Sequence, residues 1–261
     1  MNKKAMELNL KNTSFVTPHG LDNNNHYTTA YDLAVLSDYA LRNKIFSKIV
    51  KTKTYTISIN NRPKTISNTN ELLGNFEGIY GIKTGFTNGA NRCLVTSCKR
   101  NDLDFICVVL GCDTKKDRTR DTINLLNYAF NNYSVINIKG IIFEKFNEWH
   151  TIHKDSFYVS KGQTQNLSLF LNESDFPFSN IALKTSDKID VEIIFTSFIN
   201  APVYKKSKIG EAKLFINNTF FYSVDILNNN EIPKKNIIFY LYFILRNYNM
   251  YFHKNSPIYK I

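Results

Sequence analysis

The sequence predicts an α+β protein: a domain with an antiparallel sheet and helices, then a small all-β domain, then an apolar helix at the C-terminus. Up to residue 133, segments with helical spacing of apolar residues mix with alternating, strand-like segments. Beyond that point short β-rich runs dominate, separated by Gly, Asn and Asp turns. Near the end, aliphatic and aromatic residues run together between basic flanks. We therefore expect three parts, at residues 1–133, 134–231 and 232–261.

The composition is that of a globular protein with an excess of basic residues. The 261 residues are 43% hydrophobic and 21% charged, with a formal net charge of +11. Lysines are scattered and no recognition motif gathers them, so we expect no nucleic-acid partner. Two interpretations of the charge stay open. We favour the interpretation that the lysines are spread over solvated faces. The other interpretation is that the charge attracts the protein to an anionic membrane or cell-wall polymer.

The first two helices are predicted close to the N-terminus. Residues 1–8 have the spacing of an amphipathic helix, and they lack the apolar stretch of a signal peptide. Turn-forming residues then predict a loop over residues 11–27. Thr29 and Asp32 match a capping box, with Thr29 as the cap and Asp32 as its reciprocal partner, and a helix is expected to follow.

Two more helices are predicted in the first part, at Lys44–Val50 and Lys116–Tyr133. In the second of these, Arg118 and Arg120 are expected on the solvated side. Its apolar face is expected at Ile123, Leu126 or Leu125, Ala129 and Phe130.

Strands are predicted where residues alternate or are rich in β-formers. In the first part these runs are Thr52–Ile59, followed by a turn at Asn60–Pro63, then Cys93–Cys98 and Phe105–Leu110. In the second part they are Phe157–Val159, Asn166–Leu171, Asp190–Phe195 and Lys213–Ile216.

Metal and cofactor sites are not expected. His150 and His153 are three residues apart in a segment interpreted as β-rich, where they would point to opposite faces. The four cysteines, at positions 93, 98, 107 and 112, form no Cys-x-x-Cys pair. Buried free thiols are the favoured interpretation, and a cross-strand disulfide stays open for an extracytoplasmic chain.

The C-terminal tail has the composition of a membrane-surface helix. The uninterrupted apolar run at 237–245 is shorter than the about 20 residues that span a bilayer. As a helix it would place Lys235, Arg246, Asn249 and His253 in a thin polar stripe on an aromatic, apolar surface. The alternative is a buried core element. We favour the anchor because the segment is terminal.

One stretch of the first part has the features of a chemical site. Gly78–Thr87 contains Lys83-Thr84-Gly85, and two predicted strands follow it directly. Lys-Thr-Gly is one of three short motifs of serine enzymes that penicillin acylates.

Residues 1 to about 130 resemble the second part of the D-alanyl-D-alanine carboxypeptidases, low-molecular-mass penicillin-binding proteins of the DacA/DacF type. The β-rich part and the tail resemble the C-terminal domain and the membrane anchor of that family. The segments that carry the resemblance are Met1–Ala5, Lys11–Phe15, Thr17–Asp22, Tyr27–Ala34, Asn68–Asn70, Gly81–Thr87, Cys93–Arg100, Val108–Gly111, Ala201–Lys206 and Gly210–Leu214. The resemblance implies part of a penicillin-binding or β-lactamase-like transpeptidase domain, which begins at an internal helix of the family and is thus N-terminally truncated.

The resemblance also implies an activity: removal of the terminal D-alanine from peptidoglycan stem peptides through an acyl-enzyme on a serine. Lys83 would supply positive charge, and Thr84 would bind the carboxylate of the substrate. Gly85 would let the substrate backbone approach, and the backbone N–H of Phe86 would contribute to the oxyanion hole. Implied partners are the stem peptide ending in D-Ala-D-Ala, β-lactam antibiotics and a membrane surface, at the extracytoplasmic face of the cell membrane.

The sequence departs from that pattern at the nucleophile. No serine in the chain is followed by lysine at the Ser-x-x-Lys spacing, and Ser-x-Asn occurs only at Ser58-Ile59-Asn60, near a predicted turn. Ala90-Asn91-Arg92 stands where the family usually has Ala-Gly. We therefore expect a chain that is inactive alone, with an unpaired sheet edge, and cytoplasmic if made without a leader. The alternatives are a non-catalytic envelope-binding module with a membrane anchor, and a β-lactamase-like hydrolase, which the β-rich part and the tail disfavour.

Overall fold

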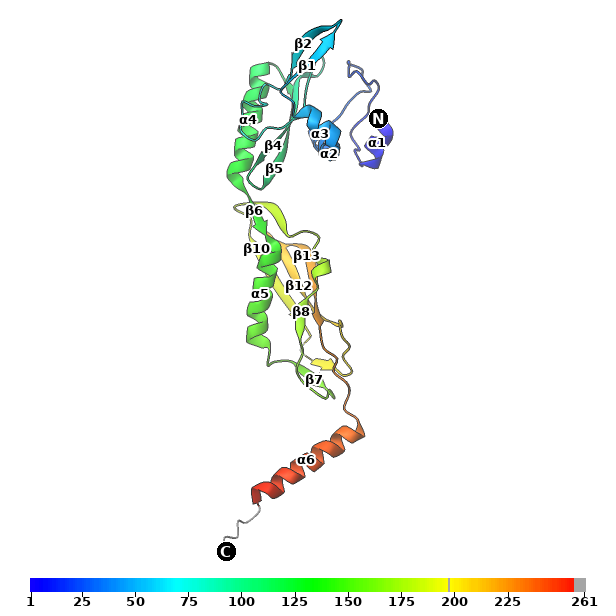
Figure 1. The fold of residues 1–261 in the computed structure, drawn as a ribbon, viewed down its shortest axis with the longest axis vertical. Helices are drawn as coiled ribbons and strands as arrows, with labels where there is room; N and C mark the ends of the chain where they lie inside the picture. The colour runs from blue at the N-terminus through cyan, green and yellow to red at the C-terminus, as the bar shows by residue number, and fades with distance from the viewer. Residues whose placement is uncertain (197, 256–261) are drawn as a thin grey trace. The chain divides into compact units, whose positions relative to one another are not determined.

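The computed structural model describes residues 1–196 and 198–255, with side chains up to residue 246. The chain forms two compact units (Figure 1). Unit 1 contains Met1–Val135 and Ala182–Thr185, and unit 2 contains the residues between and after these segments. The Lys-Thr-Gly motif lies in unit 1.

The centre of unit 1 is an antiparallel sheet with the strand order β3-β4-β5. Its strands are β3 (Lys83–Thr87), β4 (Asn91–Arg100) and β5 (Leu103–Cys112). The register pairs Lys83 with Val95, and the strands predicted around Cys93 and Phe105 are confirmed. Within the described part of the chain, β3 and β5 each pair on one side only, which agrees with the expected unpaired edge.

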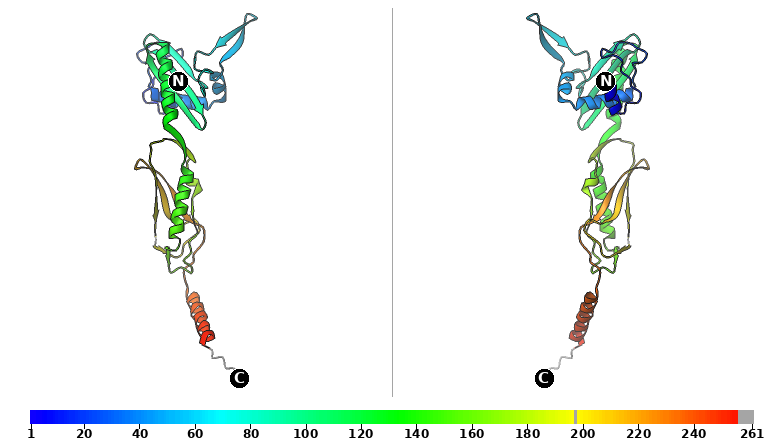
Figure 2. Two further views of the ribbon diagram at one scale, coloured as in Figure 1. Left: turned by 90° about the vertical axis from the view of Figure 1, so that its left-hand side faces the viewer. Right: turned by 90° about the vertical axis from the view of Figure 1, so that its right-hand side faces the viewer.

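Helices cover both faces of this sheet. The helix α4 (Lys115–Asn132) lies along one face and α2 (Ala30–Leu41) along the other (Figure 2). The α4 side chain of Leu126, 1% exposed, fills a core with Leu94 and Cys98. Five consecutive buried residues in the middle of β4 show that the sheet is covered on both sides.

The N-caps of both helices follow the sequence. The Thr29 hydroxyl accepts a 3.1 Å hydrogen bond from the Asp32 backbone N–H, as predicted. The prediction that the Asp32 side chain is the reciprocal partner of the Thr29 backbone in a capping box is wrong. The Asp32 carboxylate instead accepts from the Asn12 backbone N–H at 3.0 Å and the Thr13 hydroxyl at 2.7 Å. Asp32 therefore ties the N-terminal loop to α2 rather than closing its own helix end.

The remaining elements of unit 1 are short. Two helices, α1 (Asn2–Glu7) and α3 (Lys44–Val50), confirm the predicted helical segments. The strands β1 (Thr54–Ile59) and β2 (Arg62–Ser67) form a hairpin whose turn residues, Asn60 and Asn61, have φ of 49° and 60°. Asparagine is one of the few residues that tolerates this left-handed conformation, which two-residue hairpin turns need.

The expectation that the second domain is all-β is wrong, because unit 2 contains the long helix α5 (Ile138–His153). Its buried residues Ile138, Ile142 and Phe146 recur every four positions, which makes one apolar stripe along the helix. The stripe packs on the four-stranded sheet of unit 2, against Leu214 and Val224 among others. His150 and His153 consequently lie on a helix, not on a strand.

The strands of unit 2 form one four-stranded sheet and small pairs. The sheet contains β8 (Leu169–Leu171), β10 (Ile189–Phe195), β12 (Lys208–Ile216) and β13 (Thr219–Asn228). One pair is β7 (Tyr158–Ser160) with β11 (Phe198–Asn200), and a short 3₁₀ turn, η1, covers Glu173–Asp175. The other pair is β6 (Tyr133–Asn137) with β9 (Asn180–Lys184), two strands that each contain residues of both units.

The last helix, α6 (Ile237–Asn255), begins five residues after Ile232, which belongs to a small core of unit 2 together with Val159, Ala201, Val203 and Ile209. Its side chains from Ile237 to Leu245 are exposed, apart from the half-buried Phe239. Asn249 and His253 of the predicted polar stripe lie outside the described side chains. Across the described residues, no helix combines the length and apolarity needed to cross a membrane.

Candidate functional site

The Lys-Thr-Gly motif forms most of the edge strand β3 and lines a cleft of about 830 Å³ in unit 1. The four predicted site residues, Lys83, Thr84, Gly85 and Phe86, all line this cleft. Its other walls come from the N-terminal loop, the segment before β3, the start of β4 and the first turn of α4. These residues are Pro18, His19, Gly20, Asn68, Thr69, Glu71, Thr87, Ala90, Arg92, Cys93, Lys115 and Arg118.

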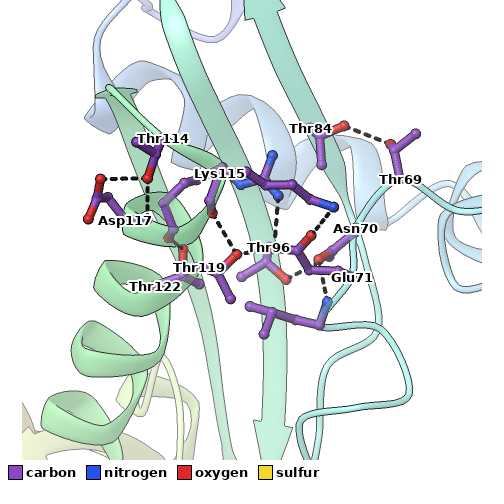
Figure 3. Close-up of polar contacts among 12 residues, drawn as sticks. Thr69, Asn70, Glu71, Thr84, Thr96, Thr114, Lys115, Asp117, Thr119 and Thr122 are labelled. Atoms are coloured by element: carbon purple, nitrogen blue, oxygen red, sulfur yellow. Dashed lines mark hydrogen bonds and ion pairs between the residues drawn. The ribbon is translucent and has the colours of Figure 1, made fainter.

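A buried polar network fixes the entry to β3. The carbonyl oxygen of Gly81 accepts hydrogen bonds from the Asn70 side-chain amide at 2.7 Å and from the Thr96 hydroxyl at 2.6 Å. Asn70 and Thr96 are both buried, and they approach each other in Figure 3. Because a buried carbonyl needs its partners, this network holds the chain in place at Gly81, two residues before the strand β3 begins at Lys83.

The Thr84 hydroxyl is hydrogen-bonded to a second hydroxyl in the wall of the cleft. The Oγ1 atoms of Thr84 and Thr69 lie 2.7 Å apart (Figure 3). Thr69 belongs to the segment before β3, so two segments place hydroxyl groups at one point of the cleft wall. Each hydroxyl can donate one hydrogen bond and accept others, so the pair can serve a carboxylate ligand. Beside them, the Lys83 ammonium donates to the carbonyl oxygen of Thr84.

The fold of unit 1 does not require a glycine at position 85. A Cβ atom built at this position would lie 3.5 Å from Cys93 Cβ, which is an ordinary van der Waals contact. The φ angle of Gly85 is outside the left-handed region that favours glycine. The absence of a side chain at Gly85 therefore leaves space in the cleft for a ligand to approach the backbone of β3.

Phe86 presents its ring to the cleft together with an arginine. The ring is more than half exposed, and the Arg92 guanidinium carbon lies 3.6 Å from its centroid. This cation–π contact crosses the β3–β4 pair, since the register pairs Phe86 with Arg92. Arg92, which stands at the departure from the family pattern, thereby adds a cation at the cleft.

The expectation that Arg118 is solvated is wrong. Its side chain is 4% exposed, in the first turns of α4, and it lines the cleft. Its Nη2 lies 3.4 Å from Glu71 Oε1, and neither Nε nor Nη2 has a hydrogen-bond partner in the described part of the chain. A buried guanidinium with free N–H groups at a cleft is prepared to receive an anion.

Glu71 is the carboxylate that balances this arginine. It also forms an ion pair with Lys115 and accepts a hydrogen bond from the Thr119 hydroxyl (Figure 3). Burial alone would raise the pKa of Glu71. The hydrogen bonds from Lys115 and Thr119, with the charges of Lys115 and Arg118, outweigh burial and hold this pKa below its usual value.

The cleft carries net positive charge. Lys83, Arg92, Lys115 and Arg118 contribute four cations against the single carboxylate of Glu71, a balance of +3 among its lining residues. Such a concentration of charge in a concave surface favours an anionic ligand.

The absence of a metal site stays a prediction, and the structure shows the contacts of His150 and His153. His153 Nδ1 lies 2.8 Å from the Trp149 carbonyl oxygen, and His150 stacks on Phe146 and Phe157. Among the described residues, no group of three His, Cys, Asp or Glu side chains could hold a metal ion. All four cysteines are free, and burial raises the pKa of Cys107 to about 11.

Three comparisons with known proteins agree with one another. Residues 1–114 match the family model described as D-alanyl-D-alanine carboxypeptidase. The D-alanyl-D-alanine carboxypeptidase DacF of Bacillus subtilis is 34% identical over 218 residues, which cover 80% of this chain and 52% of the relative. DacD of Escherichia coli is 29% identical over 219 residues, which cover 82% and 52%. The chain thus spans about half the length of the curated relatives that it matches.

Solved structures share the fold. Penicillin-binding protein 6B of Escherichia coli superposes with a TM-score of 0.60 at 23% identity, covering 87% of this chain and 58% of the other. Penicillin-binding protein 5 of Haemophilus influenzae gives 0.58 at 24% identity, covering 89% and 64%.

Proposed function

Since residues 1–114 of this chain belong to the D-alanyl-D-alanine carboxypeptidase family, we propose that the cleft is one wall of a serine-type D-Ala-D-Ala carboxypeptidase site of peptidoglycan maturation. One observation carries this proposal. The Lys-Thr-Gly-Phe strand and the buried Arg118 line the same cationic cleft. A stem peptide that ends in D-Ala-D-Ala brings the carboxylate that such a cleft would bind.

The residues of the cleft divide the work of binding. The Thr84 hydroxyl and the free N–H groups of Arg118 receive the terminal carboxylate of the substrate. Lys83 supplies positive charge beside the scissile bond, and Gly85 lets the peptide backbone come close to β3. In this proposal the backbone N–H of Phe86 donates a hydrogen bond to the oxyanion that develops during acyl transfer.

The covalent step needs a group that these 261 residues do not contain. In the reaction, a serine oxygen attacks the carbonyl carbon between the two D-alanines, and its proton passes to a base and then to the departing D-alanine. Water later hydrolyses the acyl-enzyme and frees the serine. The chain has no Ser-x-x-Lys, so this nucleophile and its base come from outside these residues. β-Lactam antibiotics would acylate the same serine.

The tail supports a place at the extracytoplasmic membrane surface. The described side chains of α6 are mainly exposed aliphatic and aromatic groups, preceded by Lys234 and Lys235. This combination suits the boundary between headgroups and acyl chains.

The missing Ser-x-x-Lys also favours a second candidate function, a non-catalytic envelope-binding module that uses the same cleft and tail.

A peptide titration tests the cleft in both candidate functions. A tripeptide that ends in D-Ala-D-Ala with a free carboxylate is expected to shift the backbone amide resonances of residues 83–86 in ¹⁵N-labelled protein. The control is the same tripeptide with a C-terminal amide, which is expected to bind far more weakly because it lacks the charge. Equal binding of the two peptides, or shifts elsewhere only, would contradict the proposal.

A penicillin-labelling experiment tests the origin of the nucleophile. The purified chain is expected to form no covalent adduct with a fluorescent penicillin, read on a denaturing gel and by intact mass. Adding a separately prepared polypeptide that contains the family's Ser-x-x-Lys and Ser-x-Asn is expected to restore labelling, on the added polypeptide. A labelled 261-residue chain on its own would refute the assignment. Failure of labelling in the mixture, with the peptide still bound, would favour the binding module.

A further inference from the structure

The end of unit 2 that leads into α6 carries exposed aromatic rings. Tyr158 on β7 and Phe198 on β11 stack with centroids 5.4 Å apart, and Tyr204 follows in a turn. Their side chains are 52%, 58% and 64% exposed, respectively. Aromatic rings rarely stay this exposed in a group without a partner surface, so these three need an explanation.

Backbone pairing gathers three segments at this end. β7 and β11 pair in parallel, and Val203 forms a bridge with Ile232. Gly162 forms a bridge with Lys234, and the Lys235 N–H donates to the Lys161 carbonyl oxygen at 2.8 Å. Figure 1 shows β7 at the end of unit 2 from which the chain continues to α6. The aromatic rings and the start of the tail therefore belong to one surface.

Lysines lie in the same segments as the rings. Lys161, Lys205, Lys206, Lys234 and Lys235 lie in these same segments, against the two carboxylates Asp155 and Glu231, a balance of +3. None of these five ammonium groups forms an ion pair in the described part of the chain. Lys235 instead lies over the Phe239 ring of α6, with its Nζ 5.7 Å from the centroid. The lysines are thus free to meet anions from outside the chain.

We propose that this aromatic-basic patch, formed by Tyr158, Phe198 and Tyr204 with Lys161, Lys205, Lys206 and Lys234, binds the surface of a bilayer that contains anionic lipid. The inference rests on the proposed membrane attachment of α6 and assigns a second contact to the folded unit. Tyrosine and phenylalanine partition to the headgroup region, and lysines are attracted by anionic headgroups.

Chain length supports the assignment. Lys235 is held by Lys161, and α6 begins two residues later at Ile237. Two residues span at most about 7 Å. A helix lying in the interface therefore keeps the edge of the patch at Lys161 and Lys235 close to the lipid charges, at a distance comparable to one Debye length of about 8 Å. A soluble polyanion would neutralise the lysines but give the three rings no apolar surroundings, so the bilayer is the better match.

A fluorescent reporter tests the position of the patch. Tyr204→Trp in the full chain is compared with the parent, whose single tryptophan, Trp149, packs against Phe157 and Phe195. With vesicles of 70% POPC and 30% POPG that carry brominated acyl chains, the variant is expected to show additional quenching and a blue shift. Vesicle binding with no change in the emission of the variant relative to the parent overturns the proposal.

Charge reversal tests the same surface without a reporter. Lys205→Glu with Lys206→Glu is expected to lower vesicle partitioning about tenfold or more on 30% POPG and to leave it unchanged on pure POPC. The matched control, Lys64→Glu with Lys188→Glu, makes the same charge change at exposed lysines outside the patch and is expected to have a small effect.

The outcomes separate the patch from the tail and from the cleft. Equal partitioning of both double variants, with vesicles still bound, overturns the patch and leaves α6 as an anchor. No vesicle binding by any variant overturns the patch and the anchor together, while the peptide titration of the cleft is unaffected. Binding to soluble poly(glycerol phosphate) that depends on Lys205 and Lys206, without bromolipid quenching at position 204, identifies a polyanion and overturns the bilayer.

Discussion

Replacing Leu126 by alanine is expected to lower the free energy of unfolding of unit 1 by about 2–5 kcal/mol. Leu126 is 1% exposed and packs in the core between α4 and the sheet, with Leu94, Cys98, Cys107 and Val109. Its removal leaves a cavity among residues that the β4–β5 pairing holds in place. Denaturant unfolding of the full chain, followed by hydrogen exchange at β4 and β5, measures the effect.

The neighbouring leucine provides the control. Leu125→Ala removes the same atoms from the same helix, but Leu125 is 49% exposed, so a change within about 0.5 kcal/mol is expected. Hydrogen exchange in the α5 core of unit 2 is expected to be unchanged, because its buried residues form a separate cluster. Equal losses for the two leucines would contradict the assignment of the α4 face.

Replacing Arg118 by leucine is expected to weaken binding of the carboxylate-ended tripeptide by about 10- to 150-fold. This corresponds to about 1.5–3 kcal/mol for a hydrogen bond to a charged group. The guanidinium is buried at the cleft and, although Nη2 is ion-paired with Glu71, neither Nε nor Nη2 has a hydrogen-bond partner among the described residues, so a ligand carboxylate would complete its hydrogen bonding. The titration of the amides at residues 83–86 gives the dissociation constant.

Two companion variants make the Arg118 result specific. Arg118→Lys keeps the charge but loses the two-pronged geometry, so an intermediate loss is expected. Arg120→Leu removes a side chain of the same helix that is 60% exposed and paired with Asp117 and Asp121, and the affinity is expected to stay unchanged. A folded Arg118→Leu protein that still prefers the carboxylate over the amide by the original ratio would remove Arg118 from the proposed site.

The site strand was predictable from sequence, and its surroundings were not. Lys83, Thr84, Gly85 and Phe86 are contiguous, so a short motif identifies them. Glu71 and Arg118 lie far apart in the chain and meet only because α4 returns along the sheet. Arg118, Thr122 and Leu126 share one buried row of α4 at four-residue spacing, yet two of the three are polar. A search for apolar periodicity therefore misses this row. The four-residue spacing back from the apolar Leu126 to Thr122 and Arg118 is the signal that could have identified Arg118 as buried.

The helix α5 was missed for a different reason, because its segment was predicted to be β-rich. Ile138, Ile142 and Phe146 have the spacing of a core-facing helix. The segment is also rich in isoleucine and aromatic residues, which favour a strand by propensity, and it contains Gly140, which disfavours a helix interior. Packing on the sheet of unit 2 decides in favour of the helix, where Asn137 caps Gly140 at 2.9 Å. Tertiary burial outweighed local preference at these residues.

Gly85 gives unit 1 a position at which folding and ligand recognition can be separated genetically. A Cβ atom there meets only an ordinary contact with Cys93, while the residue lies in the middle of the strand that lines the cleft. Selection for a folded chain is therefore indifferent to alanine at this position, and selection for a peptide bound against β3 is not. Variation tolerated at position 85 among natural or selected sequences would report which of them still use the cleft.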